Sequence, residues 1–292
     1  MDPEEYSRLA DRGLRRQIRH QLFPYSPFYR RVLDETGITA HGFGGASDLR
    51  QMPLITREQF AQTSGDFILR APETSIQRRG PARQVSQVVV NKLLRGVAGA
   101  DRELADEYQT VHTLETTGTT GEPLQIHLTR RDLAALSTQA SRSLQVAGVG
   151  GGDFVLSLLE PSSAGGFWPI WLGAIALGAE ILAPGFLDPE FAAALALKSG
   201  ATVIVGRAED TLMVMEASGG IDTLRTLILG PERVSPVLRR RIQEEAGDQV
   251  SVVATYGFSE ARGFWAECMQ GSLHPDSGFH LTGLEIVEVI SR

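Results

Sequence analysis

Three short segments carry residue types suited to gripping a polyphosphate. The first is the run Thr-Thr-Gly-Thr-Thr-Gly-Glu-Pro at residues 116–123. Its two glycines let the backbone approach a ligand and turn N–H groups toward an anion, and its four threonine hydroxyls add donors. The second segment is Gly230-Pro231-Glu232 and the third is Tyr256-Gly257-Phe258-Ser259-Glu260. The Glu260 carboxylate is a candidate ligand for a phosphate-bridging Mg²⁺ ion.

Each segment also has a simpler interpretation. A Thr/Gly-rich hairpin loop is more often only a turn, Glu260 alone suits a surface glutamate, and Tyr256 alone suits a packing residue. The 116–123 run is not a Walker loop, because Gly-Lys-Ser/Thr is absent. It is not a dinucleotide-binding fingerprint either, because the residues after Pro123 alternate like a strand instead of opening a helix.

The elements that position these segments follow from the hydrophobic pattern after about residue 111. Strand-like runs alternate with helical segments, three of which begin at clear signals: Thr129 to Asp132, Asp188-Pro189 and Ser235-Pro236. This alternation predicts an α/β fold with a doubly wound, mostly parallel sheet and flanking helices. Ligands of such sheets lie beyond the carboxyl ends of the strands. The expected strands are 111–114, 124–128, 154–159, 201–205, 224–229 and 250–254, with an apolar helix near 166–178.

Residues 1–110 are expected to form a helical lead-in that packs on an α/β core of residues 111–292. Apolar residues at helical spacing predict a helix over about 3–22, and Thr56 with Gln59 has the form of a capping box. Between residues 78 and 106 the pattern is too weak for an assignment. A cluster of arginines here suits a solvated helix face, with a phosphate or carrier-protein contact as the alternative. Its members are Arg12, Arg15, Arg16, Arg19, Arg30 and Arg31.

Composition excludes several classes of protein. Of the 292 residues, 42% are hydrophobic and 22% charged, which argues against disordered, collagen-like and disulfide-scaffold chains. The net charge of −7 does not suit a nucleic-acid binder. Cys268 is the only cysteine, so no internal disulfide forms. The apolar run 167–179 is too short to span a membrane, and the acidic N-terminus is unlike a signal peptide. We therefore expect a soluble, cytoplasmic protein with no membrane or nucleic-acid partner.

The three segments, in this order, resemble the adenylate-forming (AMP-binding) superfamily of acyl- and aryl-CoA synthetases. The first is similar to the phosphate loop of that superfamily and the last to its Tyr-Gly-x-Ser/Thr-Glu motif. Other runs are similar to the phenylacetate–CoA ligase family within it, over nearly the whole chain, which looks like the large N-terminal domain only. These runs are Pro27 to Arg30, Thr36 to Ile38, Asp48-Leu49, Met52 to Leu54, Gly152-Asp153, Glu267-Cys268, Leu273-His274 and Glu285 to Val287.

The resemblance implies a two-step reaction. A carboxylate attacks the α-phosphate of ATP, giving an acyl-adenylate and pyrophosphate, and a thiol then displaces AMP. The thiol belongs to coenzyme A or to the phosphopantetheine arm of a carrier protein. By motif, Thr116, Thr117, Gly118, Thr119, Thr120 and Gly121 would grip the phosphates, Glu260 the Mg²⁺ ion, and Ser259 the α-phosphate or acyl oxygen. Thr119, Ser259 and Glu260 would be catalytic. Gly230, Pro231 and Glu232 with Tyr256, Gly257 and Phe258 would border the adenine and acyl pocket, Tyr256 also touching the acid.

The acid is expected to be small and aromatic, in an apolar slot lined by Phe167 and Trp168. Ordinary core packing is an equally good interpretation of these aromatic residues. Some members of the family hold a structural zinc ion near the position of Cys268 and His274. With His280 as the only further candidate, the sequence offers fewer than the four ligands that such sites need, so we expect no zinc.

The sequence departs from the family at its C-terminus. Family members continue into a small mobile domain that carries a lysine for the adenylation step. The two lysines here, Lys92 and Lys198, have no such context, so we expect this chain alone to be weak or inactive. Three hypotheses remain: an acid–CoA ligase, an enzyme that loads its acid onto a carrier protein in natural-product biosynthesis, and a degenerate nucleotide- or acyl-binding module. The acid itself and the oligomeric state are left open.

Overall fold

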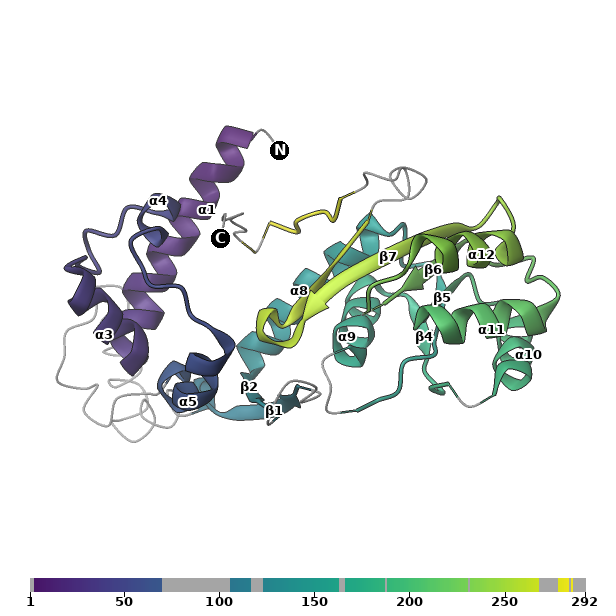
Figure 1. Ribbon diagram of the computed structural model, residues 1–292, viewed down its shortest axis with the longest axis horizontal. Helices are drawn as coiled ribbons and strands as arrows, with labels where there is room; N and C mark the ends of the chain where they lie inside the picture. The colour runs from purple at the N-terminus through teal and green to yellow at the C-terminus, as the bar shows by residue number, and fades with distance from the viewer. Residues whose placement is uncertain are drawn as a thin grey trace, which may run out of the picture. The chain divides into compact units, whose positions relative to one another are not determined.

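The computed structural model describes residues 3–69, 106–116, 123–162, 166–186, 188–230, 232–267, 278–283 and 285. Contacts divide the chain into two compact units (Figure 1). One unit is Met1–Val111 with Gly283–Arg292, and the other is His112–Thr282. Among the described residues, no helix is long and apolar enough to cross a membrane.

The first unit is helical, as the sequence predicts over residues 3–22. Its helices are α1 (Pro3–Gln17), the π-helical turn η1 (Ile18–Leu22), α2 (Phe23–Tyr25), α3 (Pro27–Thr36), α4 (Ala46–Leu49) and α5 (Arg57–Phe67). They surround a small core of Ile18, Leu33, Ala40 and Phe43. The predicted capping box is confirmed: the Thr56 hydroxyl accepts from the Gln59 N–H, and the Gln59 side chain accepts from the Thr56 N–H.

The second unit alternates strands and helices around one large sheet. Its strands are β1 (Thr110–Glu115), β2 (Gln125–Thr129), β3 (Phe154–Ser157), β4 (Glu180–Leu182), β5 (Val203–Gly206), β6 (Thr226–Leu229), β7 (Ser251–Phe258) and β8 (Gly263–Ala266). Its helices are α8 (Arg130–Val146), α9 (Phe167–Leu177), α10 (Pro189–Ser199), α11 (Ala208–Ser218), α12 (Pro236–Ala246) and the 3₁₀ turn η2 (Ser259–Ala261). β1 and β2 form a separate pair, and the other six strands form a sheet in the order β4-β3-β5-β6-β7-β8.

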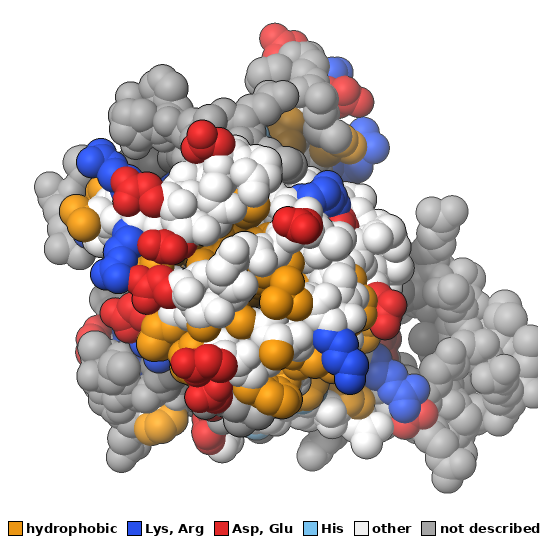
Figure 2. Space-filling model, turned by 90° about the vertical axis from the view of Figure 1, so that its right-hand side faces the viewer, with side chains coloured by type: hydrophobic (Ala, Val, Ile, Leu, Met, Phe, Trp, Pro, Cys, Tyr) orange, Lys and Arg blue, Asp and Glu red, His pale blue; other side chains and the backbone are white. Residues whose placement is uncertain are grey.

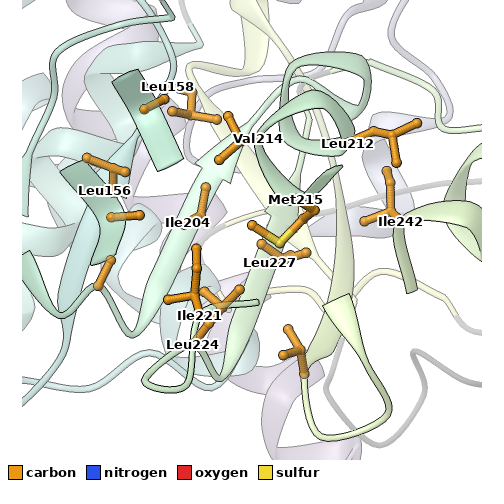
Figure 3. Packing of buried hydrophobic residues seen from close by; sticks show 14 of the residues in the cluster. Leu156, Leu158, Ile204, Leu212, Val214, Met215, Ile221, Leu224, Leu227 and Ile242 are labelled. Atoms are coloured by element: carbon orange, nitrogen blue, oxygen red, sulfur yellow. The ribbon is translucent and has the colours of Figure 1, made fainter. Parts of the chain in front are cut away.

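Helices cover both faces of the sheet, so the doubly wound prediction is confirmed. The neighbours from β4 to β7 are parallel, and only β8 runs antiparallel to its partner. In β5, Ile204 packs with α10, α11 and α12, while Val203 and Val205 pack with α8 and α9 on the opposite face. Figure 3 shows the α11 side of this core, where Met215 lies beside Leu227 of β6. On the outer side drawn in Figure 2, acidic and basic side chains lie among apolar ones.

A buried carboxylate joins the amino ends of three strands. Asp153, which precedes β3, accepts hydrogen bonds from the Gly150 N–H at 2.8 Å and the Thr202 hydroxyl at 2.7 Å, and pairs with Arg225. Burial raises the pKa of Asp153, but the bonds from Arg225, Thr202 and Gly150 outweigh it, so the pKa lies below its ordinary value. The carboxylate is therefore charged at neutral pH and ties β3 to the segments that lead into β5 and β6.

Candidate active site

A cavity of about 200 Å³ lies at the carboxyl edge of the parallel sheet. Segments that end β3, β5, β6 and β7 meet there, together with the start of α9 and the β1 residue Leu114. Most of the wall is apolar, from Leu114, Leu159, Pro169, Ile170, Val205, Phe258 and Phe264. Gly166, Gly230, Gly257, Gly263, Thr255, Ser259 and Arg262 complete it. The wall thus combines an apolar slot with bare backbone and a few polar groups.

The strand expected over residues 250–254 is longer in the structure, so the segment Tyr256–Phe258 belongs to β7 instead of following it. β7 pairs in parallel with β6 as far as Ala254 and then continues, pairing antiparallel with β8 from Thr255 to Phe258. The strand β8 supplies the backbone hydrogen-bond partners that keep Tyr256–Phe258 extended, and the aromatic residues of that segment favour strand geometry. Gly257 therefore lies in the β7–β8 hairpin, and its backbone forms part of the cavity wall.

Glycine is required at two cavity positions because a neighbouring atom lies where a Cβ would be. A Cβ atom on Gly257 would lie 2.6 Å from the Gly263 carbonyl oxygen of β8. A Cβ atom on Gly230 would lie 2.0 Å from the hydroxyl oxygen of Thr255, which itself donates to the Leu229 carbonyl at 3.0 Å. Side chains are thereby excluded at both positions, and the neighbouring strands pack closely where they reach the cavity.

Of the two described residues of the segment Gly230–Glu232, Gly230 lines the cavity and Glu232 does not. Pro231 lies outside the described residues. Glu232 accepts a hydrogen bond at 3.3 Å from Nε of Arg207, which follows β5, and this is an exposed ion pair. The hydrogen bond to Glu232 is the largest of the effects that raise the pKa of Arg207. The pKa of Asp210, in the first turn of α11, is also raised, and burial is the largest cause.

Of the Thr/Gly-rich run 116–123, only Thr116 and Pro123 are described. Thr116 is buried, its N–H donates to the Leu124 carbonyl at 3.0 Å, and its hydroxyl accepts from the Leu124 N–H at 2.9 Å. Thr116 therefore holds together the two ends of the loop between β1 and β2. Thr117, Gly118, Thr119, Thr120 and Gly121 lie outside the described residues, and their phosphate-binding role stays a prediction.

The predicted aromatic residues lie beside the cavity and not in its described wall. Phe167, the first residue of α9, is buried in the core. The Trp168 indole donates to the Ser162 carbonyl at 2.8 Å and packs edge-on against His112. α9 contributes Pro169 and Ile170 to the wall instead. Tyr256 lies half-exposed on the opposite face of the hairpin, where its ring stacks on Trp265 with centroids 6.1 Å apart.

Ser259 and Glu260 form the 3₁₀ turn η2 directly after β7. Ser259 lines the cavity, whereas the side chain of Glu260 is outside the description. Cys268 and His274 also lie outside the described residues, so the zinc expectation is not examined by the structure. Across the described part of the chain, no group of three or more His, Cys, Asp or Glu side chains is placed to hold a metal ion.

Two features of the site were missed by sequence reasoning. The side-chain amide of Gln139, from the middle of α8, bonds both the N–H and the carbonyl of Phe264 in β8, and Ser143 donates to the same carbonyl. Arg262, at the tip of the β7–β8 hairpin, donates to Asp132 at the start of α8 at 2.6 Å. Both contacts link residues more than 120 positions apart, and no local pattern in the sequence marks them.

Lys198 lies far from this edge in the topology. It is in the last turn of α10, which leads into β5 and so returns to the amino edge of the sheet. Lys92 lies outside the described residues.

Comparison with known proteins agrees with this arrangement. The chain is 24% identical over 266 residues to a phenylacetate–coenzyme A ligase of Thermus thermophilus, covering 89% of this chain and 52% of that protein. Among solved structures, it resembles 2-hydroxyisobutyryl-CoA ligase in complex with 2-HIB-AMP and CoA in the thioesterification state, with a TM-score of 0.72 at 18% identity over 97% of this chain and 55% of that one. The postadenylation state of the same ligase gives a TM-score of 0.71 at 16% identity over 97% and 54% of the two chains.

The chain thus spans about half the length of the relatives it matches. The family model for AMP-binding enzymes matches residues 68–287, which include the whole cavity wall. The protein therefore belongs to the AMP-binding enzyme family.

Proposed function

We propose that this protein activates a small aromatic carboxylic acid with ATP, forming an acyl-adenylate, and that the acyl group is then transferred to the thiol of coenzyme A. The cavity at the carboxyl edge carries this proposal. It joins an apolar slot to the bare backbone of Gly230 and Gly257 and to the hydroxyl of Ser259. Membership of the AMP-binding family and the likeness to a phenylacetate–coenzyme A ligase support the same reaction.

The chemical demand is that two anions, the carboxylate and the α-phosphate, meet while further charge develops on the phosphate oxygens. Ser259 would donate its hydroxyl to an oxygen of the reacting group. Thr117 to Gly121 would present backbone N–H groups and hydroxyls to the β- and γ-phosphates. The apolar wall around Ile170 and Phe264 would hold the acyl group and keep water from the acyl-adenylate.

A Mg²⁺ ion fits the donor set through Glu260. Magnesium is commonly held by one or two carboxylates together with substrate phosphates, so no dedicated cluster of protein ligands is needed. Glu260 follows Ser259 in η2, at the end of β7 that borders the cavity. Bound there, the ion would neutralise phosphate charge, while Ser259 orients the reacting oxygen.

The thiol that accepts the acyl group belongs either to coenzyme A or to the phosphopantetheine arm of a carrier protein. Arg8, Arg12 and Arg16 are exposed and recur at one-turn spacing along α1, which would suit an acidic carrier protein. Arg19 differs, because its guanidinium donates to the Ala40 and Phe43 carbonyls of its own unit. Thioester formation with coenzyme A and with a phosphopantetheinylated carrier protein, measured side by side, separates the two acceptors.

The first test is a thermal-shift screen of this chain against acyl-sulfamoyladenosines, which are stable mimics of acyl-adenylates. The panel contains benzoyl, phenylacetyl, aminoacyl and alkanoyl members, with ATP and Mg²⁺ alongside. Selective stabilisation by the benzoyl or phenylacetyl member is expected, and selectivity for an alkanoyl or aminoacyl member would contradict the aromatic assignment. A chain that responds to none of these ligands would contradict the proposed nucleotide site.

A further inference from the structure

Arg262 is the one charged residue in the described wall of the cavity. Its side chain is 43% exposed, so it lies where the cavity opens to solvent. The Thr255 hydroxyl in the same wall already donates to the Leu229 carbonyl. Ser259 and Arg262 are therefore the described side chains that can offer hydrogen-bond donors to a ligand, and the proposed function uses Ser259 at the reacting group.

The backbone of Arg262 adopts a conformation that side chains disfavour. Its φ is 60° and its ψ is 18°, and it is the one residue other than glycine with positive φ in the described part of the chain. Glycine would occupy this position without strain. A non-glycine residue held in the left-handed region next to a ligand cavity is a reason to look for a role of its side chain.

The guanidinium is fixed in direction by Asp132. Nη1 of Arg262 donates to Oδ1 of Asp132 at 2.6 Å, while Oδ2 accepts from the N–H and the hydroxyl of Thr129 at 2.9 and 2.8 Å. The carboxylate is thus held at the N-terminus of α8 by Thr129. A guanidinium has five N–H donors, and among the described residues Arg262 donates to Asp132.

We infer that Arg262 determines substrate specificity by donating a hydrogen bond to an oxygen on the acyl group of the acid. This inference rests on the proposed function and narrows its substrate class to acids that carry a hydroxyl or a second carboxylate beyond the reacting carboxyl group. Asp132 neutralises the charge of Arg262, so the pair favours an oxygen acceptor, neutral or anionic, over a bare hydrocarbon. A site built around such a donor discriminates against analogues that leave it unpaired.

The test compares three mimics that differ only at the ring: benzoyl-, 3-hydroxybenzoyl- and 3-carboxybenzoyl-sulfamoyladenosine. Their dissociation constants are measured by calorimetry for the unmodified chain and for Arg262→Gly, which suits the backbone conformation and should fold. We expect the unmodified chain to bind at least one oxygen-bearing mimic about 10-fold more tightly than the benzoyl mimic. In Arg262→Gly that preference should fall to within about 2-fold.

Arg241→Ala is the matched control, because Arg241 forms an exposed ion pair with Glu216 between α12 and α11, and neither residue lines the cavity. This control should keep the full preference. A preference for the hydroxyl or for the carboxylate mimic identifies the acceptor. The inference is overturned if the unmodified chain shows no preference, if the preference survives in Arg262→Gly, or if that variant loses all three mimics equally, as a purely structural role requires. Failure of the unmodified chain to bind any mimic or AMP would instead refute the proposed function, and this inference with it.

Discussion

Replacing Gln139 by leucine should loosen the hairpin that forms one wall of the cavity. Gln139 is buried on α8, and its side-chain amide accepts a hydrogen bond from the Phe264 N–H at 3.3 Å and donates one to the Phe264 carbonyl. These are the two bonds that a neighbouring strand would otherwise make to β8. Leucine has a similar volume but no polar atoms. The Phe264 carbonyl would keep the bond from Ser143, whereas the Phe264 N–H would have no partner.

The expected cost follows from that one orphaned donor. A buried N–H without a partner costs about 1–3 kcal/mol, so we expect the free energy of unfolding to fall by about 2 kcal/mol. For a unit of this size the same loss lowers Tm by roughly 4–8 °C. Because Phe264 lines the cavity, binding of an acyl-sulfamoyladenosine should weaken as well.

Urea unfolding of three variants tests this reasoning. Ser143→Ala should cost less than Gln139→Leu, because the Phe264 carbonyl then keeps Gln139 as a donor. Gln145→Leu, on the exposed side of the same helix, should stay within about 0.5 kcal/mol of the unmodified chain. A Gln139→Leu variant as stable as Gln145→Leu would refute the view that the amide of Gln139 holds β8 in place.

Three other outcomes are expected. Gly257→Ala would bring a Cβ to 2.6 Å from the Gly263 carbonyl oxygen and should lower the free energy of unfolding in urea by about 1–3 kcal/mol. Gly152→Ala, where a Cβ would have nothing within 4 Å, should leave the free energy of unfolding almost unchanged. Equal effects of the two substitutions would contradict the close approach of β7 and β8. Asp153→Asn should cost about 2 kcal/mol at pH 7. Because the pKa of Asp153 is lower in the folded chain than in the unfolded chain, its carboxylate stabilises the fold fully above the unfolded pKa of about 3.9, and this stabilisation is lost as pH falls through the folded pKa. The difference in free energy of unfolding between the unmodified chain and Asp153→Asn should therefore shrink toward pH 3, and a difference that stays constant from pH 7 to pH 3 would be inconsistent with this account. Lys198→Ala should leave the binding of acyl-sulfamoyladenosines unchanged, because α10 leads back to the amino edge of the sheet; weaker binding by this variant would contradict that placement of Lys198.

Local signals in the sequence were sufficient for the fold class and for most elements of the second unit. The capping box at Thr129 and the Asp188-Pro189 start locate α8 and α10, because these signals act within one turn of chain. β4 and α11 were not predicted. β4 is only three residues long, and α11 is apolar on more than one side, so neither has a distinct period.

The site was less accessible to sequence reasoning, because its shape depends on pairing between distant segments. The run 250–254 has the composition of a strand, but the extension of β7 to Phe258 depends on β8 returning alongside it. The position of the cavity against α9 also could not be predicted. The apolar run supplies residues for every side of the helix, and packing against α8 and the sheet decides that Ile170, and not Trp168, lines the cavity.

The central claim is that this cavity binds the acyl-adenylate, and calorimetric titration of a cavity-filling variant tests it most directly. Ile170→Phe enlarges a buried wall residue, while Ile175→Phe makes the same change at an exposed position of α9. The best acyl-sulfamoyladenosine of the panel should bind Ile175→Phe as it binds the unmodified chain and should bind Ile170→Phe at least 10-fold more weakly, about 1.4 kcal/mol. Equal affinity for the two variants would contradict the assignment of the ligand to this cavity.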